Sequence, residues 1–177
     1  MSINVYITDL AAYNEGNLVG KWVQLPMDED ELEETIQKIL EEGHCGHEGC
    51  FHEEWFITDY EAPFRVGEYE DIYRLNEWAE RLEDCSEEDD EDVVQAIFGY
   101  TGSIEKRLDI LEDGRYRVFY DCRNMADVAW TIVDERGLLN DVPENIARYF
   151  DYKSYGIDLR HEGTFICIPG GKYLEIW

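Results

Sequence analysis

The sequence predicts an elongated α+β protein made of three small subdomains in series: an α/β unit, a central acidic helical unit and a C-terminal α+β unit. Apolar segments with a period of two residues are interspersed with segments of helical period. Breaks around Pro63 and Gly67, and again from Gly99 to Gly102, divide the chain. We therefore place the subdomains at residues 1–62, 63–102 and 103–177.

The first subdomain, residues 1–62, is expected to combine strands with one helix. Alternating apolar residues predict strands at residues 3–10, 19–25 and 55–60. Asp28 is the expected N-cap of a helix that ends at Gly43. Four apolar residues at helical spacing predict its buried face: Leu32, Ile36, Ile39 and Leu40.

The central subdomain, residues 63–102, is expected to be helical and strongly acidic. Its first helix is predicted from apolar residues at helical spacing: Ile72, Leu75, Trp78, Ala79 and Leu82. Ser86 is expected to cap a second helix, whose first turns would be the six consecutive acids of residues 87–92. The helix dipole explains two or three acids in a first turn, but not six.

The third subdomain, residues 103–177, is expected to mix short helices and strands. Helices are predicted at residues 103–113 and from Met125 to a stop at Gly137, with a strand at 116–120 between them. Pro143 suits the first position of another helix, running to Phe150. Residues 164–177 read as a closing hairpin.

The negative charge of the chain is concentrated in one region. The chain has 42 acidic and 15 basic residues and a net charge of −27. Residues 28–92 contain 26 of these acids and four bases, which gives this region a net charge of −22. An acidic surface adapted to salt would be spread evenly, so the clustering indicates a use. Charge of this sign argues against direct binding to duplex nucleic acid and to anionic membranes.

The sequence favours a cytoplasmic protein without a membrane segment. The N-terminus has no basic leader region, and no apolar run reaches the roughly 18 residues of a membrane helix. The five cysteines are odd in number and scattered, which is typical of reduced thiols. Glycine-rich phosphate loops, zinc-protease helices and nucleophile elbows are all missing from the sequence. We therefore expect neither an enzyme nor a cofactor.

One short segment has the composition of a metal site. Three of the four histidines and two of the five cysteines lie within residues 44–52. Thiolate and imidazole are the ligands that zinc prefers, and four side chains here offer them: Cys45, His47, Cys50 and His52. The spacing is too compact for the usual pair of separated ligand segments. The main expectation is therefore no metal, and a structural zinc is the alternative.

The acidic residues of the predicted helices are the strongest lead. Their 22 excess charges match the charge of roughly 11 base pairs of duplex DNA, at one charge per ~1.7 Å. Carboxylates on one helix face lie about 5–6 Å apart. Such an array fits a groove lined with Lys and Arg, whereas a merely solvated face is the alternative. The candidate partner-binding residues are Asp28, Glu29, Asp30, Glu33, Glu34, Glu41, Glu42, Glu70, Asp71, Glu77, Glu80, Glu83, Asp84, Glu87, Glu88, Asp89, Asp90, Glu91 and Asp92.

Three stretches of the chain share short motifs with a known family. The first is Val5-Tyr6-Ile7, Leu10, Tyr13-Asn14-Glu15-Gly16, Leu18-Val19-Gly20 and Trp22; the second is Asp59-Tyr60-Glu61 with Pro63-Phe64. The third covers residues 138–152, followed by Tyr155-Gly156, Asp158-Leu159 and Gly163-Thr164-Phe165. Together they resemble the ArdA antirestriction proteins over most of the chain. Residues 44–52 depart from the family pattern and resemble an insertion.

The resemblance implies a function and a set of partners. It implies a DNA mimic that occupies the DNA-binding groove of type I restriction–modification enzymes, at the methyltransferase core, and so protects incoming mobile genetic elements. It also implies a curved homodimer joined through the C-terminal part. The residues that match the antirestriction motif, near the dimer contact, are Leu138, Leu139, Asp141, Val142, Pro143, Glu144, Ile146, Tyr149, Phe150, Asp151 and Tyr152. Ordinary core packing is the alternative for these apolar and aromatic residues.

Two further functions stay open. The acidic array would also suit another DNA-binding protein, such as a nucleoid protein, a repressor or a nuclease. A zinc-binding regulatory protein with a solubilising acidic surface is the other alternative.

Overall fold

The computed structural model describes residues 2–44, 52–86, 90–100 and 102–177. The chain forms two compact units, Met1–Asp89 and Asp90–Trp177. Both units combine helices with a small antiparallel sheet, which confirms the α+β class. The arrangement as three subdomains in series stays a prediction.

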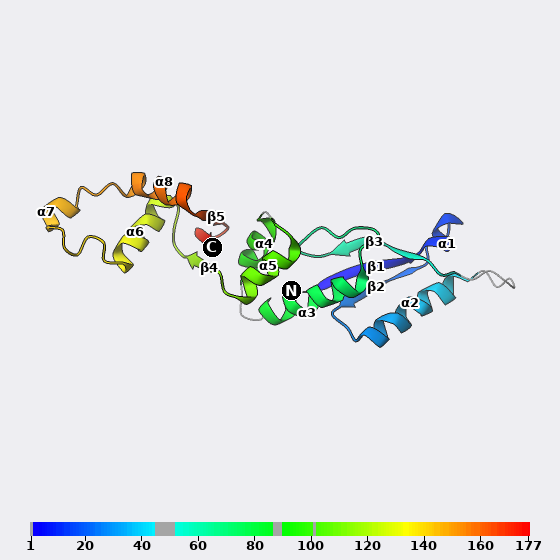
Figure 1. Ribbon diagram of the computed structural model, residues 1–177. Helices are drawn as coiled ribbons and strands as arrows, with labels where there is room; N and C mark the ends of the chain where they lie inside the picture. The colour runs from blue at the N-terminus through cyan, green and yellow to red at the C-terminus, as the bar shows by residue number, and fades with distance from the viewer. Residues whose placement is uncertain (1, 45–51, 87–89, 101) are drawn as a thin grey trace. The chain divides into compact units, whose positions relative to one another are not determined.

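The first unit is built on a three-stranded antiparallel sheet (Figure 1). Its strands are β1 (Ile3–Asp9), β2 (Gly20–Leu25) and β3 (Trp55–Glu61), in the order β2-β1-β3. The predicted alternation holds, since Ile3, Val5 and Ile7 on β1 are fully buried. A short helix that the sequence pattern did not indicate, α1 (Leu10–Asn14), follows β1 directly.

Two longer helices complete the first unit, and both have the predicted buried faces. Asp28 caps α2 (Glu29–Gly43) by accepting hydrogen bonds from the Asp30 and Glu31 amides, as expected. The apolar residues predicted for α2 and for α3 (Ile72–Ser86) are all buried. Asn76 on α3 bonds the amide and the carbonyl of Met27, at 2.9 and 2.8 Å, and so connects α3 to the segment before α2.

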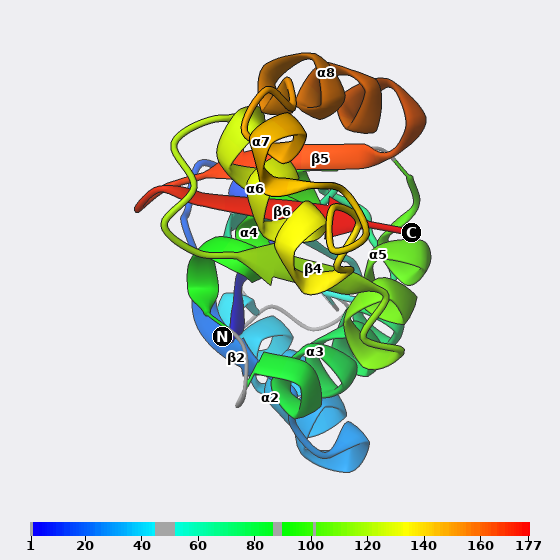
Figure 2. The same cartoon turned by 90° about the vertical axis from the view of Figure 1, so that its left-hand side faces the viewer.

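The second unit contains another three-stranded antiparallel sheet, in which β6 lies between β4 and β5 (Figure 2). The elements in chain order are α4 (Glu91–Gly99), α5 (Ile104–Glu112), β4 (Tyr116–Phe119), α6 (Met125–Glu135), α7 (Glu144–Ala147), α8 (Tyr152–Glu162), β5 (Thr164–Ile168) and β6 (Lys172–Ile176). The hairpin of β5 and β6 confirms the prediction for the C-terminal residues. A buried cluster joins this sheet to α6: it consists of Phe119 from β4, Cys122 from the connecting segment, and Val128 and Ile132 from α6.

The structure corrects two predicted helix starts. Ser86 ends α3 instead of capping α4, and the cap of α4 is Asp90, whose carboxylate accepts the Asp92 amide. The Asp90 carboxylate satisfies one free amide of the first turn, and Glu91 and Asp92 complement the helix dipole, which favours a start at this point. Pro143 is the N-cap of α7 and not its first residue, and α7 ends at Ala147 rather than at Phe150.

A buried carboxylate joins three segments at one end of the first sheet. The Asp9 side chain accepts the Ala12 amide at 2.9 Å, which caps α1, and its other oxygen lies 2.5 Å from His52 Nδ1. The Asp9 and His52 side chains are 0% and 2% exposed. Gly43, at the end of α2, lies against the same carboxylate, because a Cβ there would be 1.9 Å from Asp9 Oδ2. Residues from β1, α2 and the segment before β3 therefore depend on a single buried side chain.

We predict that His52→Ala destabilises the protein strongly. The substitution leaves the buried Asp9 carboxylate without its side-chain partner, which costs about 3–5 kcal/mol when one member of a buried pair is removed. Urea denaturation would measure the free energy of unfolding. The exposed His161 on α8 provides the control, since His161→Ala should change that energy by no more than ~0.5 kcal/mol. Equal stabilities for the two variants would contradict the role given to Asp9.

Candidate acidic binding surface

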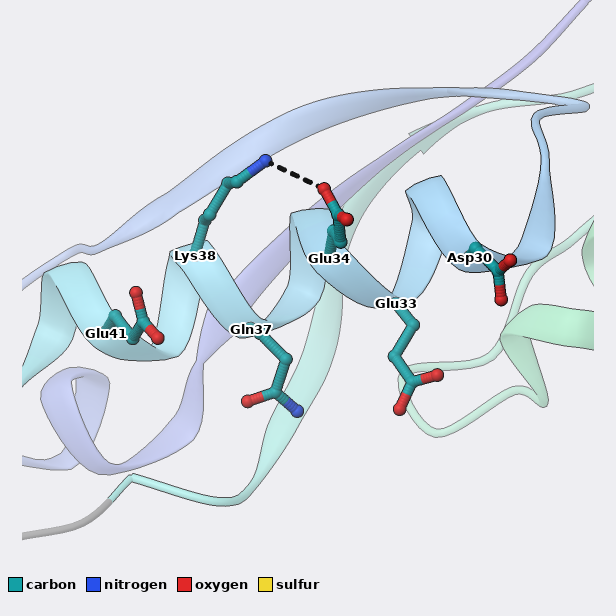
Figure 3. A pocket seen from close by; sticks show the side chains of 6 residues that line it. All are labelled: Asp30, Glu33, Glu34, Gln37, Lys38 and Glu41. Atoms are coloured by element: carbon teal, nitrogen blue, oxygen red, sulfur yellow. Dashed lines mark hydrogen bonds and ion pairs between the residues drawn. The ribbon is translucent and has the colours of Figure 1, made fainter.

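The outer face of α2 carries a row of carboxylates. Because Leu32, Ile36, Ile39 and Leu40 point into the core, most of the remaining positions of the helix face solvent. Six of them line a shallow hollow along the helix (Figure 3): Asp30, Glu33, Glu34, Gln37, Lys38 and Glu41. From Asp30 to Glu41 this row extends about 16 Å along the helix axis, at 1.5 Å per residue.

One basic residue interrupts the row on α2. Lys38 Nζ lies 3.3 Å from Glu34 Oε2, one helical turn away, and Figure 3 shows the two side chains turned toward each other. Both side chains are about two-thirds exposed, so the pair adds little to stability. Its effect is to place a cation beside one carboxylate in the middle of the row.

Helix α3 presents a second acidic face in the same unit. Ile72, Leu75, Trp78, Ala79 and Leu82 are buried, and most of the positions between them are solvent-exposed, apart from the buried Asn76 and the half-buried Arg81. Four of these positions are acids: Glu77, Glu80, Glu83 and Asp84. The spacing of three and four residues places them as neighbours on the helix surface. Ordered helices therefore hold the carboxylates of α2 and α3 at fixed intervals.

The acids at the start of α4 have a different environment. Lys172 Nζ on β6 lies 2.5 Å from Asp90 Oδ2 and 3.4 Å from Asp92 Oδ2. The hydrogen bond from Lys172 and the Asp92 amide lower the pKa of Asp90 below its ordinary value, and the Asp90 carboxylate raises the pKa of Lys172. Asp90 and Asp92 thus serve the packing of α4 against the β5–β6 hairpin, so they are weaker candidates for partner binding than the acids of α2 and α3.

The structure exposes nearly all the acids that the sequence singled out. Every predicted acid within the described ranges is exposed, except Glu70 and Asp92, which are half-buried. Glu87, Glu88 and Asp89 lie outside the described residues. The sequence reasoning missed Asp59 and Glu61, which are exposed on β3. The signal available in the sequence was the presence of two acids in a segment otherwise rich in strand-forming residues, which is typical of an exposed edge strand.

The predicted antirestriction motif, residues 138–152, is largely solvent-exposed in the chain. Helix α7 contains no buried residue, and the side chains of Leu138, Ile146 and Tyr149 are 49%, 56% and 74% exposed. Phe150 is half-buried and packs edge-on against Tyr152 and Tyr155, with ring centroids 4.9 and 5.6 Å apart. Core packing therefore does not account for Ile146 and Tyr149, which leaves their apolar surface available to a partner.

The segment after the motif is held by a close contact between two helices. Helix α8 begins where Asp151 accepts the Ser154 amide, and this hydrogen bond lowers the pKa of Asp151. Gly156 on α8 lies against the first residue of α6, because a Cβ there would be 2.4 Å from the Met125 carbonyl oxygen. Glycine is thus required at this position of the predicted signature for a packing reason.

The zinc alternative receives no support from the part of the chain that the structure covers. Within that part, no three His, Cys, Asp or Glu side chains are grouped so that they could hold a metal ion. Of the four candidate ligands, Cys45, His47 and Cys50 lie outside the described residues. His52 lies within them and bonds Asp9.

The fold and the exposed carboxylates define an acidic protein of mixed α+β structure. The chain belongs to the ArdA family of antirestriction proteins, since the model of that family matches residues 5–173, nearly the whole chain. These are inhibitors of restriction and not an enzyme family. A search among curated proteins found no match. Across the described ranges, the helices are all too short or too polar to cross a membrane.

We predict that Asp90 titrates below an ordinary aspartate, whose pKa is 3.8. Because the pKa is lowered in the folded state, the stabilisation is complete above about pH 4 and is lost as the pH falls through the folded-state pKa. Carboxyl chemical shifts followed by NMR would measure it. Lys172→Gln should raise the Asp90 pKa toward 3.8, whereas Lys106→Gln, the same change of charge on α5, should leave it unchanged. An Asp90 that titrates normally in the unsubstituted protein would contradict this assignment.

Proposed function

We propose that this protein inhibits type I restriction–modification enzymes by mimicking B-form DNA. The observation that carries the proposal is the ordered array of carboxylates on α2 and α3, in a chain of the ArdA family. A groove that binds DNA is lined with Lys and Arg placed to neutralise phosphates. Carboxylates at fixed spacing on a rigid helix offer the same groove an equivalent set of negative charges.

The geometry favours the proposed mimic over a solvated acidic surface. The acids of α2 and α3 gather on the faces opposite the buried residues, and the two helices carry eleven acids against three bases, Lys38, Arg74 and Arg81. A protein that needed charge only for solubility would gain from alternating signs, because like charges on neighbouring turns destabilise a helix. The array occupies the methyltransferase core in this proposal, so it would block modification as well as cleavage.

We also propose that the active form is a homodimer that acts in the cytoplasm on behalf of mobile genetic elements. The exposed side chains of Leu138, Ile146 and Tyr149 support an interface in the second unit. Apolar and aromatic residues of this kind are typical of interface centres. In a symmetric dimer the same patch contacts its own copy.

We predict that the protein displaces DNA from a type I enzyme and does not itself bind DNA. Both ligands would release counterions from the same groove, so the competition should weaken steeply as the salt concentration rises. Fluorescence anisotropy of a labelled duplex bound to the enzyme would follow the displacement. Inhibition that is independent of salt, or direct binding to the duplex, would refute the mimicry. Displacement of DNA from a repressor or nuclease alone would favour the alternative target.

A pair of quadruple variants tests whether the position of the acids matters. Changing Glu33, Glu41, Glu77 and Glu80 to Gln should weaken binding to the enzyme and reduce the salt slope by about one for each lost contact. The control neutralises four exposed acids of the second unit, Glu112, Asp134, Asp158 and Glu162, for the same net charge. The control should bind nearly as well as the unsubstituted protein. Equal losses in both variants would mean that only total charge matters.

We predict that Tyr149→Asp dissociates the dimer. Tyr149 is 74% exposed, so an aspartate there should not disturb the fold of the isolated chain. In an apolar dimer interface, however, the carboxylate would lose its water without gaining an opposite charge, which is costly. Light scattering would show the mass fall by half. Tyr120→Asp, at an equally accessible tyrosine outside the motif, should keep the dimer mass. A folded Tyr149→Asp variant of unchanged mass would place the interface elsewhere.

A further inference from the structure

One face of the first sheet presents aromatic rings to solvent. Tyr6 on β1 and Trp22 on β2 lie directly opposite each other, and their rings meet edge-on with centroids 5.5 Å apart. The Tyr6 hydroxyl donates to the Gly20 carbonyl at 3.0 Å, which fixes its ring. Trp22 remains 44% exposed beside it. The neighbouring β1 residues, Val5 and Ile7, face the buried side.

Three more rings continue this face. Phe56 on β3 pairs with Thr8 on β1. Thr8 is two residues from Tyr6, so Thr8 and Tyr6 lie on the same side of the sheet, about 7 Å apart along the strand, and Phe56 lies on that side too. Tyr13 contacts Phe56 edge-on at 5.2 Å, and Tyr69 stacks on it at 6.2 Å. We call Tyr6, Tyr13, Trp22, Phe56 and Tyr69 the aromatic face.

The burial of these residues separates supporting rings from exposed ones. Phe56 is 8% exposed, because Tyr13 and Tyr69 cover it, and Tyr6 is half-buried. Tyr13, Trp22 and Tyr69 are 51%, 44% and 71% exposed, so each leaves a large apolar surface in water. Tyr and Trp held rigidly by neighbouring rings are the residues most often found as energetic centres of protein interfaces.

The charge around the aromatic face identifies the partner that fits it. Four exposed acids lie beside it: Asp59 and Glu61 pair with Tyr6 and Asn4 on β1, and Glu15 and Glu68 are close in sequence to Tyr13 and Tyr69. A second copy of this chain would place the same four acids against these acids, so a contact between copies at this face would be repelled. Duplex DNA would be repelled for the same reason. The rings and their acidic surroundings instead complement a basic protein surface with apolar side chains between its cations.

We propose that the aromatic face is a second contact with the restriction enzyme, which anchors the inhibitor by apolar burial beside the basic groove. This inference rests on the proposed function, because it takes the partner to be the enzyme that the acidic helices bind. The two contacts differ in their response to salt. Carboxylate contacts weaken as salt rises, whereas apolar burial does not depend on counterion release. The aromatic face therefore supplies the part of the affinity that survives at high salt.

The test compares two double variants that remove the same side chains. Trp22→Ser with Tyr69→Ser removes two exposed rings of the aromatic face. Trp177→Ser with Tyr120→Ser removes two rings of the second unit that are 62% and 64% exposed. Titration of the purified enzyme at low and at high salt measures the affinity of each. We expect the first variant to bind about tenfold more weakly at both salt concentrations with an unchanged salt slope. The second variant should bind within about twofold of the unsubstituted protein.

The outcomes separate this inference from the proposed function. Failure of the unsubstituted protein to bind the enzyme refutes the proposed function, and this inference falls with it. Normal binding by both double variants overturns the aromatic contact and leaves the mimicry intact. If the variant with Trp22→Ser and Tyr69→Ser loses binding and light scattering shows that its mass has changed, the aromatic face is a contact between copies of the chain, and the proposed contact with the enzyme is overturned. If Trp22→Ser prevents folding, the single variant Tyr69→Ser tests the contact instead, because Tyr69 lies outside the strands of the sheet. This variant should weaken binding to the enzyme several-fold.

Discussion

The structure depends on keeping its excess negative charge on the outside of helices whose other face is buried. The repulsion among the carboxylates of α2 and α3 opposes folding, and water and salt screen it over about 8–10 Å only because the groups are exposed. Buried Leu, Ile and Trp side chains on the opposite faces hold both helices in place. The same separation of faces that lets the protein fold also fixes the spacing of its charges.

Among the residues that the structure describes, Asp9 is the one Asp or Glu that is buried. Asp9, together with His52, lies inside the first unit and connects α1, the end of α2 and the segment before β3. These are the segments from which the acidic face of α2 and the aromatic rings of Tyr13 and Phe56 extend. The buried pair thus positions two exposed surfaces of opposite character in one unit.

The helices with a strong apolar period could be predicted from the sequence, and those held by other means could not. Leu32, Ile36, Ile39 and Leu40 define α2, and its exposed acids follow from that face alone. Helix α8 escaped prediction because Gly156 is its only buried residue, so no apolar period marks it. The aromatic face depends on strand register, which places Phe56 beside Thr8 and Trp22 beside Tyr6. Residues that far apart in the sequence meet only through sheet pairing, which periodicity does not specify.

The most direct test of the account is a map of carboxylate contacts in the complex with a type I restriction enzyme. A carbodiimide joins a carboxylate to a lysine in contact with it, and mass spectrometry identifies both residues. Mimicry of DNA predicts crosslinks from the acids of α2 and α3 to lysines that contact DNA, and their disappearance when the enzyme is first saturated with a duplex. Crosslinks that involve only the second unit, or that persist with DNA bound, would contradict it.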